Sequence, residues 1–100
     1  MKLGETLKQI ANAADAAAEE EARSILAAEE RRGIDAFLVQ APALAENLTT
    51  AAKYRSFLLR WPHGNTPAIR GGFHGAACAW ARENGLEPPT IEHCGVKFSW

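Results

Sequence analysis

The sequence lacks the common catalytic signatures. It has no Walker phosphate loop, no dinucleotide-binding fingerprint, no serine in a nucleophile elbow and no pair of carboxylates spaced as in an acid–base cleft. Long hydrophobic runs are missing too, because no stretch approaches the roughly 18–20 apolar residues of a membrane span. The N-terminal residues do not follow the charged-then-apolar pattern of a signal peptide. We therefore expect a protein that is not an enzyme, needs no cofactor, does not insert into a membrane and is cytoplasmic.

Cysteine is scarce as well. The chain has two among 100 residues, Cys78 and Cys94. Two cysteines cannot form the disulfide framework typical of small secreted domains, and a cytoplasmic protein keeps its thiols reduced. We expect both to be free.

A strong charge of one sign is also absent, since the net charge is −1. The charges are nevertheless unevenly distributed. Residues 1–50 contain five Lys or Arg and nine Asp or Glu, whereas residues 51–100 contain six and three. An acidic half and a mildly basic half can attract each other within one chain or between two copies.

The first third of the chain predicts a long amphipathic helix over residues 3–32. Its apolar positions recur on average about every 3.7 residues, close to the helical period of 3.6. Gly33 is the predicted stop, with Arg31 and Arg32 favourably placed near the C-terminal end of the helix dipole. The stripe is rich in alanine and buries little area alone, so we expect it to pack against a second copy. The predicted dimer interface comprises Leu7, Ile10, Ala14, Ala18 and Ile25.

Residues 34–52 predict a second helix that folds back on the first. Apolar residues from Ile34 to Ala52 again follow the helical period, and Asp35 is a candidate N-cap. Pro42 lies inside this pattern, where it should kink or restart the helix. The alternative is a short strand over residues 34–40 followed by a helix from Pro42.

The second half predicts a strand–helix–strand unit. Residues 53–61 favour a strand that ends at Pro62, residues 67–84 favour a helix with Thr66 as its N-cap, and residues 90–99 favour a last strand. The two strands are either parallel neighbours in a βαβ unit or, if Gly95 is a turn, part of a terminal hairpin. The predicted fold class is α+β, as a single domain over residues 1–100 with a helical part (1–52) and a strand–helix–strand part (53–100).

Cysteine and histidine provide one weak metal-site candidate. His74 and Cys78 are four residues apart on a predicted helix and share a face, whereas His93 and Cys94 are neighbours on a predicted strand and point to opposite faces. This is not a known zinc spacing, so we expect no metal and keep a small zinc-binding domain as a second alternative. Cys78 paired with His74 or His93 would resemble a hydrolase dyad, but a mid-helix position beside Trp and Ala favours a buried, inert thiol.

Basic and aromatic residues alternate in the second half. Such residues could stack on bases and contact phosphates, which makes nucleic-acid binding the first alternative function. The same residues could contact a protein. The candidate binding residues are Arg55, Arg60, Trp61, His63, Arg70 and Trp100.

The leading hypothesis is a small non-catalytic protein that binds another macromolecule, most plausibly a protein, as an inhibitor, adaptor or regulatory subunit. Without a catalytic motif, the available signals are the thin apolar stripe and the aromatic residues on the strands, and both are typical of interaction surfaces. We also expect a homodimer. Heavy use of Ala, Arg and Glu indicates a GC-rich bacterial or phage genome.

Overall fold

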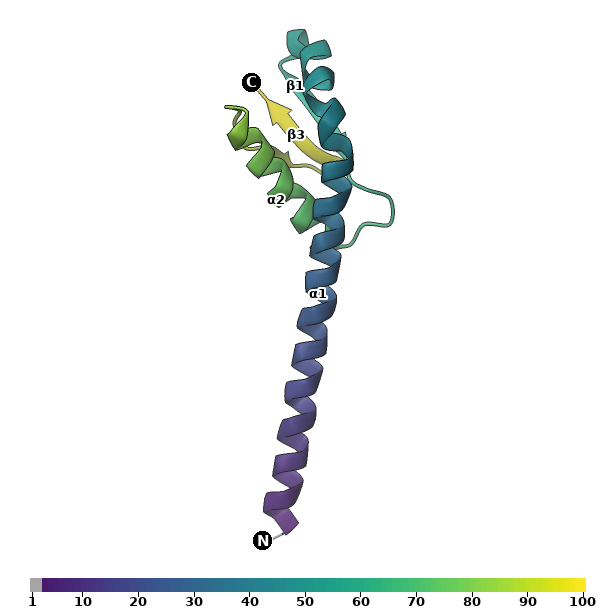
Figure 1. Cartoon of the computed structure of the whole chain (residues 1–100), viewed down its shortest axis with the longest axis vertical. Coiled ribbons are helices and arrows are strands. Elements are labelled where there is room, and N and C mark those ends of the chain that lie inside the picture. The colour runs from purple at the N-terminus through teal and green to yellow at the C-terminus, as the bar shows by residue number, and fades with distance from the viewer. Residues whose placement is uncertain (1–2) are drawn as a thin grey trace.

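The computed structural model describes residues 3–100, apart from the side chains of residues 13–17. The chain is an α+β protein, as predicted (Figure 1). Its elements in order are helix α1 (Leu3–Thr50), the short 3-10 helix η1 (Ala52–Tyr54), strand β1 (Ser56–Arg60), helix α2 (Pro67–Glu83), strand β2 (Thr90–Ile91) and strand β3 (Gly95–Ser99).

Helix α1 is one continuous helix of 48 residues, so the prediction that Gly33 ends a first helix was wrong. Gly33 lies inside α1 where α2 crosses it. A Cβ atom at Gly33 would stand 1.9 Å from the carbonyl oxygen of Ile69, and one at Gly72 would stand 2.0 Å from that of Glu30. The missing side chains thus allow the two backbones to touch. Glycine weakens a helix by about 1 kcal/mol relative to alanine, and the packing at this crossing offsets that cost.

Helix α1 also continues through Pro42, so the prediction of a separate second helix over residues 34–52, and that of a strand over residues 34–40, were wrong. Proline removes one backbone hydrogen bond, to the carbonyl group of Leu38. Pro42 itself is exposed, while Phe37, Leu44 and Leu48 on the inward face are buried. Burial of these three residues on both sides of the proline holds the helix together.

The three strands form an antiparallel sheet in the order β1-β3-β2. The parallel βαβ alternative was therefore wrong and the terminal hairpin is confirmed, with its turn at residues 92–94, just before Gly95. The predicted first strand was too long, because Lys53 and Tyr54 belong to η1. Helix α2 has the predicted cap, since Thr66 Oγ1 accepts a hydrogen bond from the Ile69 amide at 3.3 Å.

The hydrophobic core lies between the two helices and the inner face of the sheet. Phe73 of α2 makes edge contacts with Phe37 of α1 and Trp61 after β1, at ring-centroid distances of 5.7 and 5.6 Å. On the sheet, Leu59 faces Val96 across β1 and β3, and both are buried. These contacts fix the position of the loop after β1, around which four of the six predicted binding residues lie.

The molecule measures 74 × 24 × 22 Å because one part of α1 extends beyond the rest (Figure 1). We call residues 3–28 the stalk and residues 29–100 the head. Every stalk residue whose side chain is described is exposed except Thr6, which is intermediate. Among residues 3–100 no segment folds back on the stalk, so the expectation that residues 34–52 would do so was wrong. No helix in the described part of the chain is long and apolar enough to cross a membrane.

Candidate functional site

One end of the sheet gathers four of the predicted binding residues around the loop between β1 and α2. Two adjoining cavities of about 440 and 420 Å³ lie there, and both are lined by Trp61, Asn65 and His93. We call this region the loop site. Its predicted members are Arg60, Trp61, His63 and Arg70.

The loop site is held in shape by Trp61. Its backbone amide donates to the carbonyl oxygen of Cys94 at 3.1 Å, and its indole Nε1 donates to those of Glu92 and His93, each at 3.2 Å. These bonds join the loop after β1 to the β2–β3 turn. The Trp61 ring also packs against Phe73 in the core. The site is therefore built on a rigid support although it consists largely of loop residues.

The charges of the loop site favour an anionic ligand, with one exception. The Arg70 guanidinium donates to the neutral side-chain oxygen Oδ1 of Asn65, and Nδ2 of the same amide donates to the carbonyl oxygen of Pro62. Within the described part of the chain, neither Arg60 nor Arg70 forms an ion pair with a carboxylate. The exception is Glu92, which lines the larger cavity. Two guanidinium groups thus remain available for a negatively charged group.

Arg55 and Trp100 lie at the opposite end of the sheet. The indole of Trp100 donates to the carbonyl oxygen of Ala52 at 3.3 Å, and its amide donates to that of Arg55 at 3.1 Å. Trp100 lines a separate, mainly apolar groove of about 330 Å³ beside Leu48 and Trp80. Since β1 is five residues long, the two ends lie about 13 Å apart along the strand. The six predicted residues therefore form two groups.

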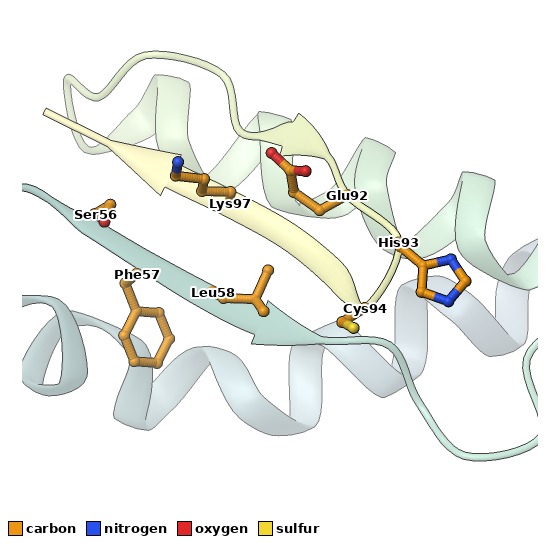
Figure 2. A pocket seen from close by; sticks show the side chains of 7 residues that line it. All are labelled: Ser56, Phe57, Leu58, Glu92, His93, Cys94 and Lys97. Carbon is orange, nitrogen blue, oxygen red and sulfur yellow. The ribbon is translucent and has the colours of Figure 1, made fainter.

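The outer face of the sheet carries a shallow cavity of about 390 Å³ that sequence reasoning missed (Figure 2). Leu58 and Lys97 face each other across β1 and β3, and Glu92 and Cys94 lie at the β2–β3 turn beside them. Leu58 is an exposed leucine at an outward position of the strand. The sequence signal for this face is Leu58 itself, an apolar residue at a strand position whose neighbours on the same face are polar.

Cys78 and His74 lie together on α2, as predicted from their spacing. Cys78 Sγ is 3.4 Å from His74 Nε2, which is 2.8 Å from the carbonyl oxygen of Pro89. Because a carbonyl group only accepts, the contact with Pro89 assigns the proton to Nε2, and the nitrogen left to accept from the thiol is Nδ1, at the longer distance of 3.9 Å. Burial raises the pKa of the Cys78 thiol, and the charge of Arg82 lowers it only in part. A nucleophilic cysteine needs the opposite shift.

The four metal-ligand candidates do not form one cluster. His74 and Cys78 lie on α2, while His93 and Cys94 lie in the β2–β3 turn and line the cavities there. Among the residues whose side chains are described, no group of three or more His, Cys, Asp or Glu is arranged to hold a metal ion. Both cysteines are free.

The predicted dimer interface lies on the stalk. Leu7, Ile10 and Ile25 are exposed by 57, 62 and 54%. Ala18 is exposed as well, and the side chain of Ala14 lies outside the described residues. The stalk therefore presents an apolar stripe that the head does not cover.

Comparisons of the chain with protein-family models, with curated proteins and with solved structures gave no match.

Proposed function

We propose that this chain is a non-catalytic interaction protein that binds another protein through its stalk. The observation that carries this proposal is the exposure of Leu7, Ile10 and Ile25 on a helix that projects from a folded head. Most of the stability of a helix in a protein comes from packing of its apolar face. A contiguous apolar surface left in water is typical of an interaction site. In this function the head anchors the helix and a partner covers the stripe.

An inhibitor, adaptor or regulatory subunit fits this arrangement. These roles require a shaped surface and no chemistry. The stalk spans 26 residues and is about 39 Å long. A partner helix or groove could contact it over its whole length.

The test is affinity capture from the native host with the full chain and two matched variants. In the first variant, Leu7→Glu and Ile25→Glu place charge on the stripe. In the second, Gln9→Glu and Ala27→Glu make changes of the same charge away from the stripe. We expect the wild-type chain and the second variant to retain the same partner, and the first variant to lose it. Retention of that partner by the first variant would refute the proposal.

Nucleic-acid binding is a second candidate, supported by the grouping of Arg60, Trp61, His63 and Arg70 at the loop site. Arginines without acidic partners contact phosphates, and the exposed part of Trp61 can stack on a base. A salt-dependent mobility shift with oligonucleotides that Arg60→Glu abolishes and Arg82→Glu leaves intact would support it. Absence of any shift at low salt would exclude it.

A further inference from the structure

The loop site contains a half-buried arginine whose charge has no acidic partner. The guanidinium group of Arg70 donates to the neutral side-chain oxygen of Asn65, and no ion pair in the described part of the chain includes it. Withdrawing a cation from water is unfavourable unless an opposite charge compensates for it. A guanidinium group has several N–H donors, so Arg70 keeps an uncompensated charge and unused donors beside the cavity of about 440 Å³.

Asn65 holds this guanidinium group in position. Its Nδ2 donates to the carbonyl oxygen of Pro62 at 3.1 Å, which turns its Oδ1 towards Arg70. Arg70 also belongs to the first turn of α2, and the N-cap of that helix, Thr66, is joined to Glu29 of α1 by a hydrogen bond. A donor that is already fixed loses little conformational entropy when a ligand binds. Arg70 is therefore preorganised to contact an anion.

The adjoining cavity of about 420 Å³ adds further groups that can donate. Arg60 and His63 line it, and His93 lines both cavities. In the described part of the chain, none of these three side chains has a hydrogen-bond or ion-pair partner. Phosphate has several oxygens that accept hydrogen bonds, and guanidinium groups match their geometry. Together with Arg70, these groups form a surface suited to a phosphate group.

Glu92 is the one carboxylate among the residues that line these two cavities. Its Oε1 accepts a hydrogen bond from Thr90 Oγ1 at 3.4 Å. In Figure 2 its carboxylate points over the sheet, towards the side of Lys97, whereas the ring of His93 points the opposite way. Within residues 3–100, Glu92 forms no ion pair with an arginine. With two arginines and one glutamate, the loop site keeps a net positive charge.

Trp61 gives the loop site an aromatic surface. The residue is half-buried and lines both cavities. Its Nε1 is already bonded to the carbonyl oxygens of Glu92 and His93, so a ligand meets the ring and not a free donor. Tryptophan rings stack on nucleobases of any kind. A ligand that combines a phosphate group with a planar base is therefore complementary to both parts of the site.

The distribution of charge favours a small ligand over a long nucleic acid. A polyanion is held by many cations along its backbone. Arg55 lies at the opposite end of the sheet, Lys97 on its outer face and Arg82 in the last turn of α2, so these residues do not extend the loop site. Each cavity also falls in the range of small-molecule sites, about 300–1,000 Å³. We infer that the loop site binds a mononucleotide, with its phosphate on Arg70 and its base against Trp61.

Isothermal titration calorimetry of the full chain with adenosine monophosphate tests this inference. The wild-type chain should bind with a dissociation constant of about 1 mM or below. Arg70→Gln should weaken binding at least about tenfold, because it removes a charge-assisted hydrogen bond. Arg82→Gln makes the same change about 18 Å further along α2 and should leave the affinity within about twofold. No binding by the wild-type chain at millimolar concentration would overturn the inference.

A second variant separates binding from folding, because Arg70→Gln also alters the contact with Asn65. Arg60 is exposed and has no partner, so Arg60→Gln should leave the Tm unchanged while it weakens binding about tenfold. Circular dichroism measures the Tm of each variant. Unchanged affinity in both arginine variants would overturn the inference even if the wild-type chain binds the nucleotide.

NMR spectra of isotope-labelled protein locate the ligand. The chain has three tryptophans, and each gives one indole N–H signal. Adenosine monophosphate should shift the signal of Trp61 and leave those of Trp80 and Trp100, which line the apolar groove at the other end of the sheet. If the largest shift falls on Trp80 or Trp100, the nucleotide lies in that groove and the inference is wrong.

Further ligands test each part of the nucleotide. Ribose phosphate should bind more weakly than adenosine monophosphate because it cannot stack on Trp61, and adenosine should bind more weakly because it lacks the phosphate. Equal affinity of either fragment and the nucleotide would overturn the inference. A single-stranded oligonucleotide that binds at least about tenfold more tightly than the mononucleotide, with a strong dependence on salt, would overturn it in favour of nucleic-acid binding.

The nucleotide site and the proposed function fail separately, because one lies in the head and the other on the stalk. A chain that captures a host protein but binds no nucleotide would retain the proposed function and reject the nucleotide site. The variant with Leu7→Glu and Ile25→Glu should lose the protein partner and bind adenosine monophosphate as the wild-type chain does.

Discussion

The crossing of α1 and α2 at Gly33 and Gly72 makes a sharp prediction, because neighbouring glycines on α2 offer matched controls. Gly72→Ala would place a Cβ atom 2.0 Å from the carbonyl oxygen of Glu30, a backbone atom that cannot turn aside as the end of a flexible side chain could. Gly71→Ala and Gly75→Ala add the same methyl group on the same helix, where nothing lies within 4 Å. The three variants therefore separate the close approach from the general effect of replacing glycine.

The magnitude follows from the distances. An ordinary contact begins at 3.4 Å, so the helices must separate by about 1.4 Å at Gly72. Overpacking of this kind lowers the free energy of unfolding by about 3 kcal/mol when no flexible side chain can move aside. The higher helix propensity of alanine offsets about 1 kcal/mol of this loss. The net loss is about 2 kcal/mol, which corresponds to a fall in Tm of roughly 8–16 °C for a domain of this size. Gly71→Ala and Gly75→Ala should instead gain up to about 1 kcal/mol.

Thermal unfolding followed by circular dichroism, together with urea unfolding, measures these differences. The expected order of Tm places Gly71→Ala and Gly75→Ala above wild type and Gly72→Ala well below it. Gly33→Ala should behave like Gly72→Ala, and the double variant should cost less than the two single losses added, since the helices separate only once. A Gly72→Ala protein as stable as Gly71→Ala would refute the close crossing.

Three further outcomes are expected. Pro42→Ala should raise the Tm in thermal unfolding, because it restores a backbone hydrogen bond at an exposed position and removes a helix penalty of up to about 3 kcal/mol. An unchanged or lower Tm would contradict the interpretation that α1 tolerates this proline at a cost. Phe73→Ala should lower the free energy of unfolding of the head by about 3–5 kcal/mol in urea, because the ring packs between two aromatic neighbours in the core. A decrease of less than about 1 kcal/mol would show that the core lies elsewhere. At neutral pH a thiol reagent should modify the exposed Cys94 faster than the half-buried Cys78, whose pKa is raised by burial so that less of the reactive thiolate is present at a given pH. Comparison of Cys94→Ser with Cys78→Ala over a range of pH measures each rate, and equal rates at neutral pH would contradict the burial of Cys78.

Local signals were enough to predict much of the head. The caps of α2 follow from Thr66 and Pro67 at its start and from Gly85, whose φ of 70° suits a helix stop. In β1 the side chains alternate between faces, with Leu59 buried and Arg60 exposed. These features depend on a few neighbouring residues and need no knowledge of the rest of the fold.

The errors came from residues whose meaning depends on distant partners. Judged from its neighbours in sequence alone, Gly33 is a typical helix stop. Its actual role, at the point where α1 and α2 cross, depends on Gly72, which is distant in sequence. Judged in the same way, Pro42 should break the helix. The burial of Leu44 and Leu48 against the rest of the head outweighs this local preference. Strand direction could not be deduced either, because it depends on which strand pairs with β3.

The candidate site shows the same division. Arg60, Trp61 and His63 are close in sequence, so their grouping could be expected, whereas Arg55 and Trp100 lie at the other end of the sheet. The attraction expected between the acidic and basic halves is not seen as ion pairs. In the described part of the chain both salt bridges lie within α1, between Glu19 and Arg23 and between Arg31 and Asp35.

The continuity of α1 through Gly33 has a consequence for changes in length. Because stalk and head share one unbroken helix, the direction of the stripe around the helix axis is fixed relative to the head. Inserting one residue into the stalk would turn the outer part of the stripe by about 100°, whereas inserting eleven would add three turns and restore its direction. Such an insertion would move the partner-facing surface about 16 Å further from the head. Working stalk lengths should therefore differ by whole sets of turns, and a single deletion should be more harmful than a longer one that keeps the phase.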